Sequence, residues 1–231
     1  RGLRDKKQRR LEQRFLAEGL RLLTDARACG RLPEILVMAE GRIPHPLLAE
    51  LEAEVLAAGG EVIETSVDIL TKITGKDNPQ AVCGVFAQWD TGLERMDRAS
   101  ASIWLVAQAM RDPGNLGTVL RTSDAAGVDG VILIGQTCDP FSVEAVRATM
   151  GSLFAMPIAT ADFAAFNEWR KQAGARMIAA SMRGTHAHDK ANYSQRSIVL
   201  MGNEGRGVTP ACASTANPMC SSARPGCGTT A

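Results

Sequence analysis

The chain has 231 residues, of which 45% are hydrophobic, 22% charged and 4% aromatic, with a formal net charge of +1 at pH 7. These values predict a soluble globular protein of one or two domains and exclude a disordered chain. No apolar run is long enough to span a bilayer, so we expect no membrane segment and no secretory leader.

The positive charge is concentrated at the start of the chain. Only Asp5 and Glu12 oppose the basic residues Arg1, Arg4, Lys6, Lys7, Arg9, Arg10 and Arg14. Such a segment could contact nucleic acid or a membrane surface, although a solvated basic helix is the simpler interpretation. The six cysteines include no C-x-x-C pair, which favours a reducing cytoplasm.

The first part of the chain predicts a small α/β domain over residues 1–89. Apolar residues near helical spacing predict a helix from about Arg9 to Gly30. Further strands are expected at 35–38, 62–63 and 82–88, and helices at 45–58 and 67–73. Residues 90–101 are polar, charged and small, and we interpret them as a linker.

Residues 102–231 predict a second α/β domain. Strands are expected at 103–107, 131–134, 156–158, 177–180 and 197–201, and helices at 115–126, 143–150 and 162–173. Strands that alternate with helices predict a parallel sheet covered by helices on both faces. Ligands of such sheets bind at the carboxyl ends of the strands.

Two polar segments follow strands of this second domain. The first is Asp112-Pro113-Gly114-Asn115, which starts a helix that carries Arg121. A fixed guanidinium there could bind a phosphate, although a capped helix with a surface arginine explains the segment equally well.

The second segment is the glycine-rich turn Gly202–Gly207. Its order, G-x-x-G-x-G, differs from the dinucleotide fingerprint G-x-G-x-x-G, so a Rossmann-type enzyme is disfavoured. A P-loop and a hydrolase nucleophile elbow are also missing from the sequence. His186, His188 and Asp189 invite a metal site, but no second ligand cluster accompanies them, and we expect no metal.

Together these segments resemble the TrmH (SpoU) group of SPOUT RNA methyltransferases. Residues 112–128 are similar to the first motif of the family and residues 198–207 to the second. The stretch 147–154 with Pro157 resembles the segment between them. Residues 9–20 are similar to the start of the family's substrate-binding domain, whose fold is like ribosomal protein L30e. The resemblance extends to about Pro210.

The resemblance implies a homodimeric, cytoplasmic enzyme that transfers a methyl group from S-adenosylmethionine to a ribose 2′-hydroxyl of tRNA or rRNA. It implies a SPOUT-type parallel sheet with a C-terminal trefoil knot, an exception to the usual unknotted topology. It further implies three sets of site residues: catalytic Asn115, Arg121 and Glu204; cofactor-binding Leu200, Gly202, Gly207 and Met219; and RNA-binding Arg9, Arg10, Arg14 and Arg147.

The tail, residues 209–231, departs from the family pattern. Pro218-Met219 resembles part of the third motif, but the Ser-Leu-Asn turn and the final apolar helix are missing from the sequence. After Val208 there is no Leu, Ile, Val or Phe, so we expect a loop rather than an amphipathic helix. A frameshift or truncation would explain this composition, and it would leave the knot incomplete. The alternative function is therefore a catalytically impaired RNA-binding remnant.

Overall fold

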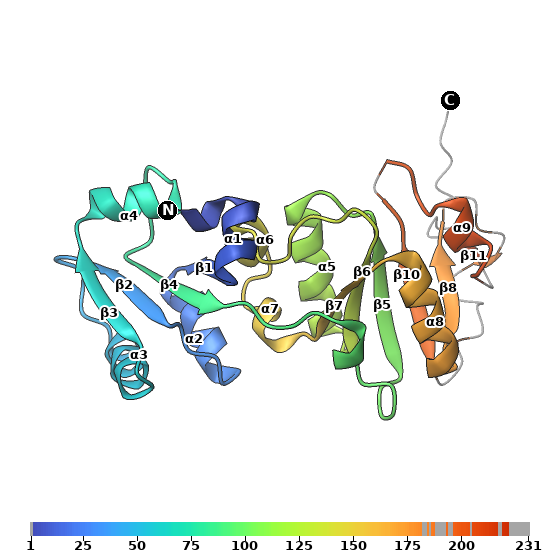
Figure 1. Ribbon diagram of the computed structural model, residues 1–231, viewed down its shortest axis with the longest axis horizontal. Coiled ribbons are helices and arrows are strands. Elements are labelled where there is room, and N and C mark those ends of the chain that lie inside the picture. Colours follow the sequence, from blue (N-terminus) through green and yellow to red (C-terminus); the bar gives the residue numbers. More distant parts are fainter. Residues whose placement is uncertain are drawn as a thin grey trace. The chain divides into compact units, whose positions relative to one another are not determined.

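The computed structural model describes residues 2–181, 184, 186–187, 193, 196–203, 205–216 and 219–221 (Figure 1). The chain forms two compact units. Unit 1 comprises Arg1–Trp89, Pro113–Arg121 and Asp139–Ala155, and unit 2 comprises Asp90–Asp112, Thr122–Cys138 and Met156–Ala231. No helix in the described ranges has the length and apolar character needed to cross a membrane.

Unit 1 contains a four-stranded mixed sheet in the order β1-β4-β2-β3. Strand β4 is antiparallel to β1 and β2, and β2 is parallel to β3. The strands are β1 (Arg14–Glu18), β2 (Ile35–Ala39), β3 (Glu61–Thr65) and β4 (Val82–Ala87). The helices are η1 (Gly2–Arg4), α1 (Lys6–Glu12), α2 (Leu20–Ala28), α3 (Pro46–Ala57), α4 (Val67–Thr74), α6 (Val143–Ala148) and α7 (Ser152–Ala155).

The two faces of this sheet are covered by different helices (Figure 1). Leu70 of α4 packs in one apolar cluster with Leu16, Val37 and Cys83. On the opposite face, a Cβ at Gly84 would lie 2.9 Å from a methyl of Leu23 in α2. Alternate residues of each strand therefore serve two separate cores.

The predicted helix from Arg9 to Gly30 is wrong in its middle. Helix α1 ends at Glu12, and its C-cap Gln13 has a φ of 52°. Strand β1 follows, and Gly19 with a φ of 104° leads into α2. Phe15, Leu16 and Ala17 are consecutive and all buried. Consecutive burial is typical of a strand whose sheet is covered on both faces, and a single amphipathic helix stripe does not give it.

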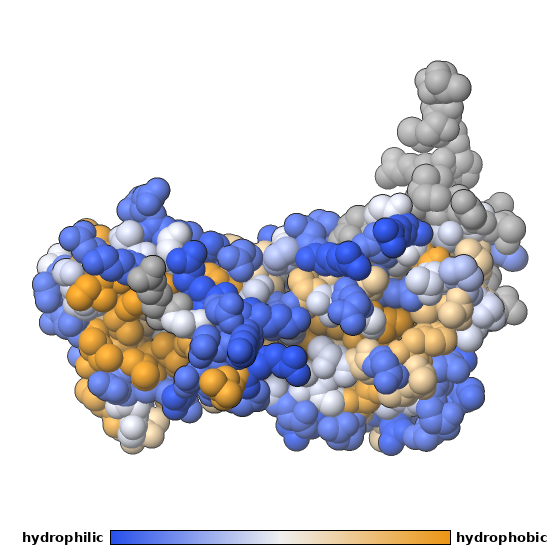
Figure 2. Space-filling model, turned by 45° about the horizontal axis from the view of Figure 1, so that its top comes forward, coloured by the Kyte–Doolittle hydropathy of each residue, from blue (hydrophilic) through white to orange (hydrophobic). Residues whose placement is uncertain are grey.

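Some apolar side chains of unit 1 remain exposed around β3 and α4. Figure 2 shows apolar surface in the left-hand part of the view, where β3 and α4 lie in Figure 1. The exposed large apolar residues of unit 1 include Ile63, Val67 and Ile69. Scattered apolar side chains are usual on protein surfaces, so they assign no partner here.

Unit 2 contains a seven-stranded sheet in the order β7-β6-β5-β10-β8-β11-β9. Each neighbouring pair of strands is parallel, which confirms the predicted parallel sheet. The strands are β5 (Ile103–Gln108), β6 (Gly130–Ile134), β7 (Ile158–Ala161), β8 (Arg176–Ala180), β9 (His186–Ala187), β10 (Ser197–Met201) and β11 (Met219–Ser221). The helices are η2 (Leu93–Arg95), α8 (Phe163–Ala173) and α9 (Pro210–Ala213). Helix α5 (Pro113–Ala125) is divided between the units, with its residues up to Arg121 in unit 1 and those from Thr122 in unit 2.

One face of this sheet packs against α8 and α9. Alternate strand residues such as Trp104, Ile132 and Leu200 form a single buried cluster with Phe166 and Trp169 of α8. Met96, which lies in the predicted linker, is 3% exposed and belongs to the same cluster. Part of the 90–101 segment is therefore packed onto unit 2 rather than extended between domains.

The loop predicted for the start of the tail is wrong. Residues 210–213 form α9, and 219–221 form β11, which lies between β8 and β9. Cys212 is 1% exposed and joins the core cluster, where it packs as a small apolar side chain. The end of the tail, residues 222–231, lies outside the described residues.

Buried charge pairs hold the later segments of unit 1 against its start. Arg9 is 3% exposed, and its guanidinium donates to Asp139 Oδ2 at 2.7 and 2.9 Å. Glu18 at the end of β1 accepts from the Arg147 guanidinium at 2.6 Å and from the backbone N–H of Gln80 at 2.9 Å. Breaking a buried pair leaves an uncompensated charge in the protein interior. These contacts therefore favour the arrangement in which residues 139–155 pack against the N-terminal segment.

The Glu18 carboxyl has a pKa below its ordinary value of 4.5. Burial raises this pKa, but hydrogen bonds from Gln80 and Arg147 and the positive charges of Lys76 and Arg147 outweigh burial. The ionised carboxylate therefore stabilises the folded protein.

We predict that Glu18→Gln lowers the free energy of unfolding by about 1–3 kcal/mol at pH 7, because the charged hydrogen bonds are lost. A depressed folded-state pKa contributes stability above the unfolded value of about 4.5, and this contribution disappears as the pH falls through the lower folded value. Urea unfolding at pH 7 and at pH 3.5 measures the difference. An equal deficit of the variant at both pH values would contradict this linkage.

Candidate functional site

A closed glycine turn follows β10, the central strand of unit 2. Asn203 and Gly207 pair across the turn, with Asn203 N donating to Gly207 O at 3.0 Å and Gly207 N to Asn203 O at 2.8 Å. The side-chain oxygen of Asn203 accepts from the amides of Gly205 at 3.0 Å and Arg206 at 3.1 Å. The turn is thus held in one shape by its own hydrogen bonds.

The three glycines of this turn differ in whether the backbone could accept a side chain at their positions. A Cβ on Gly202 would collide with the main chain of Gly207 and Val208. Gly207 adopts a φ of 66°, which favours glycine. By contrast, a Cβ on Gly205 would meet nothing closer than Asn203 Oδ1 at 3.7 Å. Only Gly202 and Gly207 are therefore required by the backbone.

Two side chains fasten the turn and the residues after it to the end of β5. Asn203 Nδ2 donates to Ala109 O at 3.0 Å, and Ala109 itself has a φ of 52°. Gln108, 7% exposed, donates to Thr209 Oγ1 at 2.7 Å and accepts from Thr209 N at 2.9 Å. The Gln108 amide also lies 2.9 Å from the sulfur of Cys212.

Sequence reasoning missed Gln108, Asn203 and Thr209 as positioning residues. The sequence pattern could have indicated Gln108. It lies on the same face of β5 as Trp104 and Val106, which are buried in the core cluster, and it is the one polar residue on that face. A buried amide in such a row requires partners.

The structure brings together the predicted cofactor residues of unit 2. Leu200 and Met219 both pair with Ala179, from opposite sides of β8, and Gly202 and Gly207 close the adjacent turn. The Leu200 side chain is fully buried in the core. Only its main-chain atoms can therefore face a ligand.

Asn115 and Arg121 lie on α5 and are both exposed. Arg121 makes no ion pair with any residue in the described ranges. Between them, Gly117 packs so closely on the backbone of Ala148 that a Cβ would collide with it. The glycine thus fixes this part of α5 against α6. The predicted catalytic residue Glu204 lies outside the described residues.

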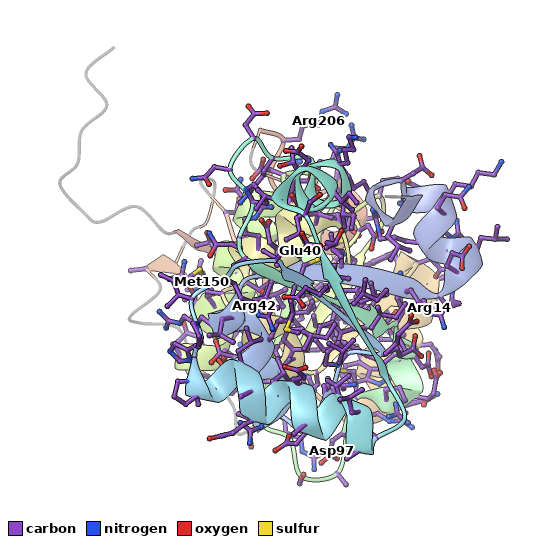
Figure 3. The ribbon with its side chains drawn as sticks, turned by 90° about the vertical axis from the view of Figure 1, so that its left-hand side faces the viewer. Arg14, Glu40, Arg42, Asp97, Met150 and Arg206 are labelled. Atoms are coloured by element: carbon purple, nitrogen blue, oxygen red, sulfur yellow. The ribbon has the colours of Figure 1, made fainter. Side chains whose placement is uncertain are left out.

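The four predicted RNA-binding arginines have different surroundings in unit 1. Arg9 is buried, donates to Asp139 and to the carbonyls of Leu3 and Arg4, and so acts as a structural residue. Arg10 is exposed. Arg14, labelled in Figure 3, has a side chain that is 43% exposed and pairs with Glu34 at 2.6 Å. Arg147 is 39% exposed beside Glu18. Burial separates Arg9 from the other three.

Metal ligands do not gather in the described part of the chain. No group of three or more His, Cys, Asp or Glu side chains able to hold a metal ion occurs there. His186 lies in β9, whereas His188 and Asp189 lie outside the described residues.

Arg206, at the exposed tip of the glycine turn, extends outward (Figure 3).

Two family models match the chain. Residues 102–221 match the SpoU rRNA Methylase family, and residues 1–84 match the MRM3-like substrate binding domain. The first match includes β5, α5, the glycine turn and β11.

Similar proteins span most of the chain. The 23S rRNA (guanosine(2553)-2′-O)-methyltransferase RlmP of Bacillus subtilis is 31% identical over 210 residues, which are 90% of this chain and 79% of that protein. The human mitochondrial rRNA methyltransferase 3 is 32% identical over 154 residues, 65% of this chain and 36% of that protein. A crystal structure of an AdoMet-bound rRNA methyltransferase from Sinorhizobium meliloti is 38% identical with a TM-score of 0.89, and the match covers 100% of this chain and 86% of that one.

The region that matches the SpoU rRNA Methylase model is more than half of the chain. It includes the glycine turn, in which Asn203 pairs with Gly207. The chain therefore belongs to the SpoU rRNA Methylase family.

Proposed function

We propose that this chain transfers a methyl group from S-adenosylmethionine to a ribose 2′-hydroxyl of ribosomal RNA. The observation that carries the proposal is the closed turn at Gly202–Gly207, at the carboxyl end of a central strand of a parallel sheet. The names of the B. subtilis and S. meliloti relatives support the reaction, the RNA class and the cofactor.

The cofactor fits the turn on steric and chemical grounds. The missing side chain at Gly202 lets the turn close on itself, and a Cβ on Gly207 would meet no heavy atom within 4 Å, so the main chain at Gly207 is open to a ligand. We assign the main chain of Leu200, Gly202 and Gly207 and the half-buried Met219 to this site. S-Adenosylmethionine, when bound, supplies an electrophilic methyl group on its sulfonium sulfur.

We assign the chemistry at the ribose to Arg121, Asn115 and Glu204. A ribose hydroxyl is a poor nucleophile at neutral pH, and a nearby positive charge favours its deprotonated form. Arg121 is exposed and makes no ion pair with a described residue, so its guanidinium is available to the phosphate and hydroxyl of the target nucleotide. By their positions in the two motifs of the family, we assign Asn115 and Glu204 to positioning the substrate.

We assign RNA contacts to Arg10, Arg14 and Arg147 and leave Arg9 out, because its guanidinium is already buried against Asp139. The proposal also includes the domain boundaries 1–89, 90–101 and 102–231, a homodimer and a cytoplasmic location. It includes a trefoil knot as well, supported by the position of β11 between β8 and β9 in the sheet.

A second candidate is an RNA-binding remnant that no longer holds the cofactor. The absence of a Ser-Leu-Asn turn from the tail sequence favours it. The packing of Cys212 and the pairing of Met219 with Ala179 argue for an intact cofactor edge. Calorimetry with S-adenosylmethionine separates the two, since the remnant gives no binding heat. Resequencing the gene through its stop codon tests the frameshift, which an intact frame excludes.

We predict that Gly202→Ala weakens S-adenosylmethionine binding at least tenfold, because the new methyl forces the turn away from Gly207. Gly205→Ala is the matched control in the same turn, where a methyl makes only an ordinary contact with Asn203 Oδ1 at 3.7 Å, and it changes the affinity less than threefold. Calorimetry on both variants measures this. Equal losses in the two variants would refute the steric explanation.

We predict that Arg121→Ala lowers the rate of methyl transfer to a 23S rRNA transcript by about 10²–10⁴-fold, since it removes the charge that stabilises the reacting oxygen. Binding of S-adenosylmethionine remains within twofold of wild type. Transfer of a tritiated methyl group under single-turnover conditions measures the rate, with the surface variant Lys171→Ala as control. Full activity of Arg121→Ala would remove this residue from the mechanism.

A further inference from the structure

A pocket separate from the glycine turn lies within unit 1, with a volume of about 330 Å³. Its lining residues include Glu18, Arg21, Lys76, Arg147 and Met150. A volume of this size is at the lower end of the range for small-ligand sites and accommodates a group the size of one nucleotide.

The charges of the pocket are arranged around one buried carboxylate. Glu18 has a side chain that is 2% exposed, and it accepts from Arg147 at 2.6 Å and pairs with Lys76 at 3.5 Å. Glu18 therefore holds two cationic side chains in defined positions. Arg147 and Lys76 remain 39% and 35% exposed, so their other N–H donors can reach a ligand.

The pocket carries a surplus of positive charge. Among its described lining residues, Arg21, Lys76 and Arg147 are cationic and only Glu18 is anionic. Helix α2 adds to this field, because it begins at the pocket and Gly19 provides no side-chain cap for its first amides. A dianionic or monoanionic oxygen group is the complementary ligand.

One wall of the pocket is apolar. Met150 is 47% exposed, and it adopts a φ of 51°, which is unusual for a residue with a side chain (Figure 3). Leu20 lines the same pocket. An anion site beside an exposed thioether is suited to a phosphate that carries a nucleoside, because the base and sugar can pack on the flexible methionine.

We propose that this pocket binds one backbone phosphate of the RNA substrate, with the attached nucleoside packed against Met150. The inference rests on the proposed RNA methyltransferase function. Glu18 acts as a positioning residue that sets the two cations, and Lys76, Arg147 and Arg21 contact the phosphate.

Filter binding of a 23S rRNA transcript at several salt concentrations tests the proposal. Lys76→Ala and Arg21→Ala are the variants of choice, because both keep the Glu18–Arg147 pair on which folding depends. Each variant is expected to weaken RNA binding about three- to tenfold near 0.15 M salt. Each is also expected to reduce the slope of log affinity against log salt by about 0.7–0.9, the value for one lost phosphate contact.

Lys171→Ala in α8 of unit 2 is the matched control. The Lys171 side chain is 60% exposed, and its ammonium pairs with Glu168 at 3.6 Å. Because Lys171 does not line the pocket, its loss leaves RNA affinity and slope unchanged. If Lys76→Ala and Arg21→Ala bind RNA with the wild-type affinity and slope, the pocket is not an RNA site.

A competition arm identifies the source of the phosphate. Inorganic phosphate and adenosine monophosphate at 10 mM should each compete only weakly with the transcript on the wild-type protein. Micromolar binding of adenosine monophosphate to the protein alone would overturn the assignment to RNA in favour of a free nucleotide.

Calorimetry with S-adenosylmethionine keeps this inference distinct from the proposed function. Lys76→Ala and Arg21→Ala should bind the cofactor as tightly as wild type does. If wild type binds the transcript with the expected losses in the variants but binds no cofactor, the methyltransferase proposal fails and the phosphate site stands. Normal cofactor binding with unaltered RNA binding by both variants defeats the phosphate site alone.

Discussion

The candidate cofactor site depends on the lack of a side chain at Gly202. Because nothing projects from its Cα, the main chain of Gly207 and Val208 can lie directly against it, and Asn203 can pair with Gly207 in both directions. The carboxyl end of β10 is thereby closed into a tight backbone loop. Any side chain at this position would open the loop and disturb the groups offered to the ligand.

The closed turn is held in place by amide side chains from β5 and from the turn itself. Asn203 reaches the carbonyl of Ala109, while Gln108 binds both the main chain and the hydroxyl of Thr209. These bonds are buried or half-buried, where an unpaired amide would be costly. They connect residues about a hundred positions apart and bring Cys212 and α9 onto the core.

Unit 1 uses buried charge where unit 2 uses amides. Arg9 with Asp139, and Glu18 with Arg147, join the N-terminal segment to residues 139–155. Five aromatic rings reinforce the same junction: Phe15, Phe86, Trp89, Phe141 and Phe154. The two kinds of contact assign one arginine of the basic N-terminus to folding and leave its neighbours at the surface. The sequence did not distinguish Arg9 from the arginines near it, because the burial of a side chain depends on the tertiary structure.

The sequence by itself determined the parallel α/β sheet and the family, because strand and helix periods alternate and two ordered motifs coincide. Only the tertiary structure decided three further matters. Phe15 to Ala17 form a strand because helices cover both faces of the sheet. The cysteine-rich start of the tail forms α9 and β11 because β8 and the core cluster supply partners that its composition does not reveal. Gln108 holds the residues after the glycine turn because its partner, Thr209, lies next to it in space but far away in the chain.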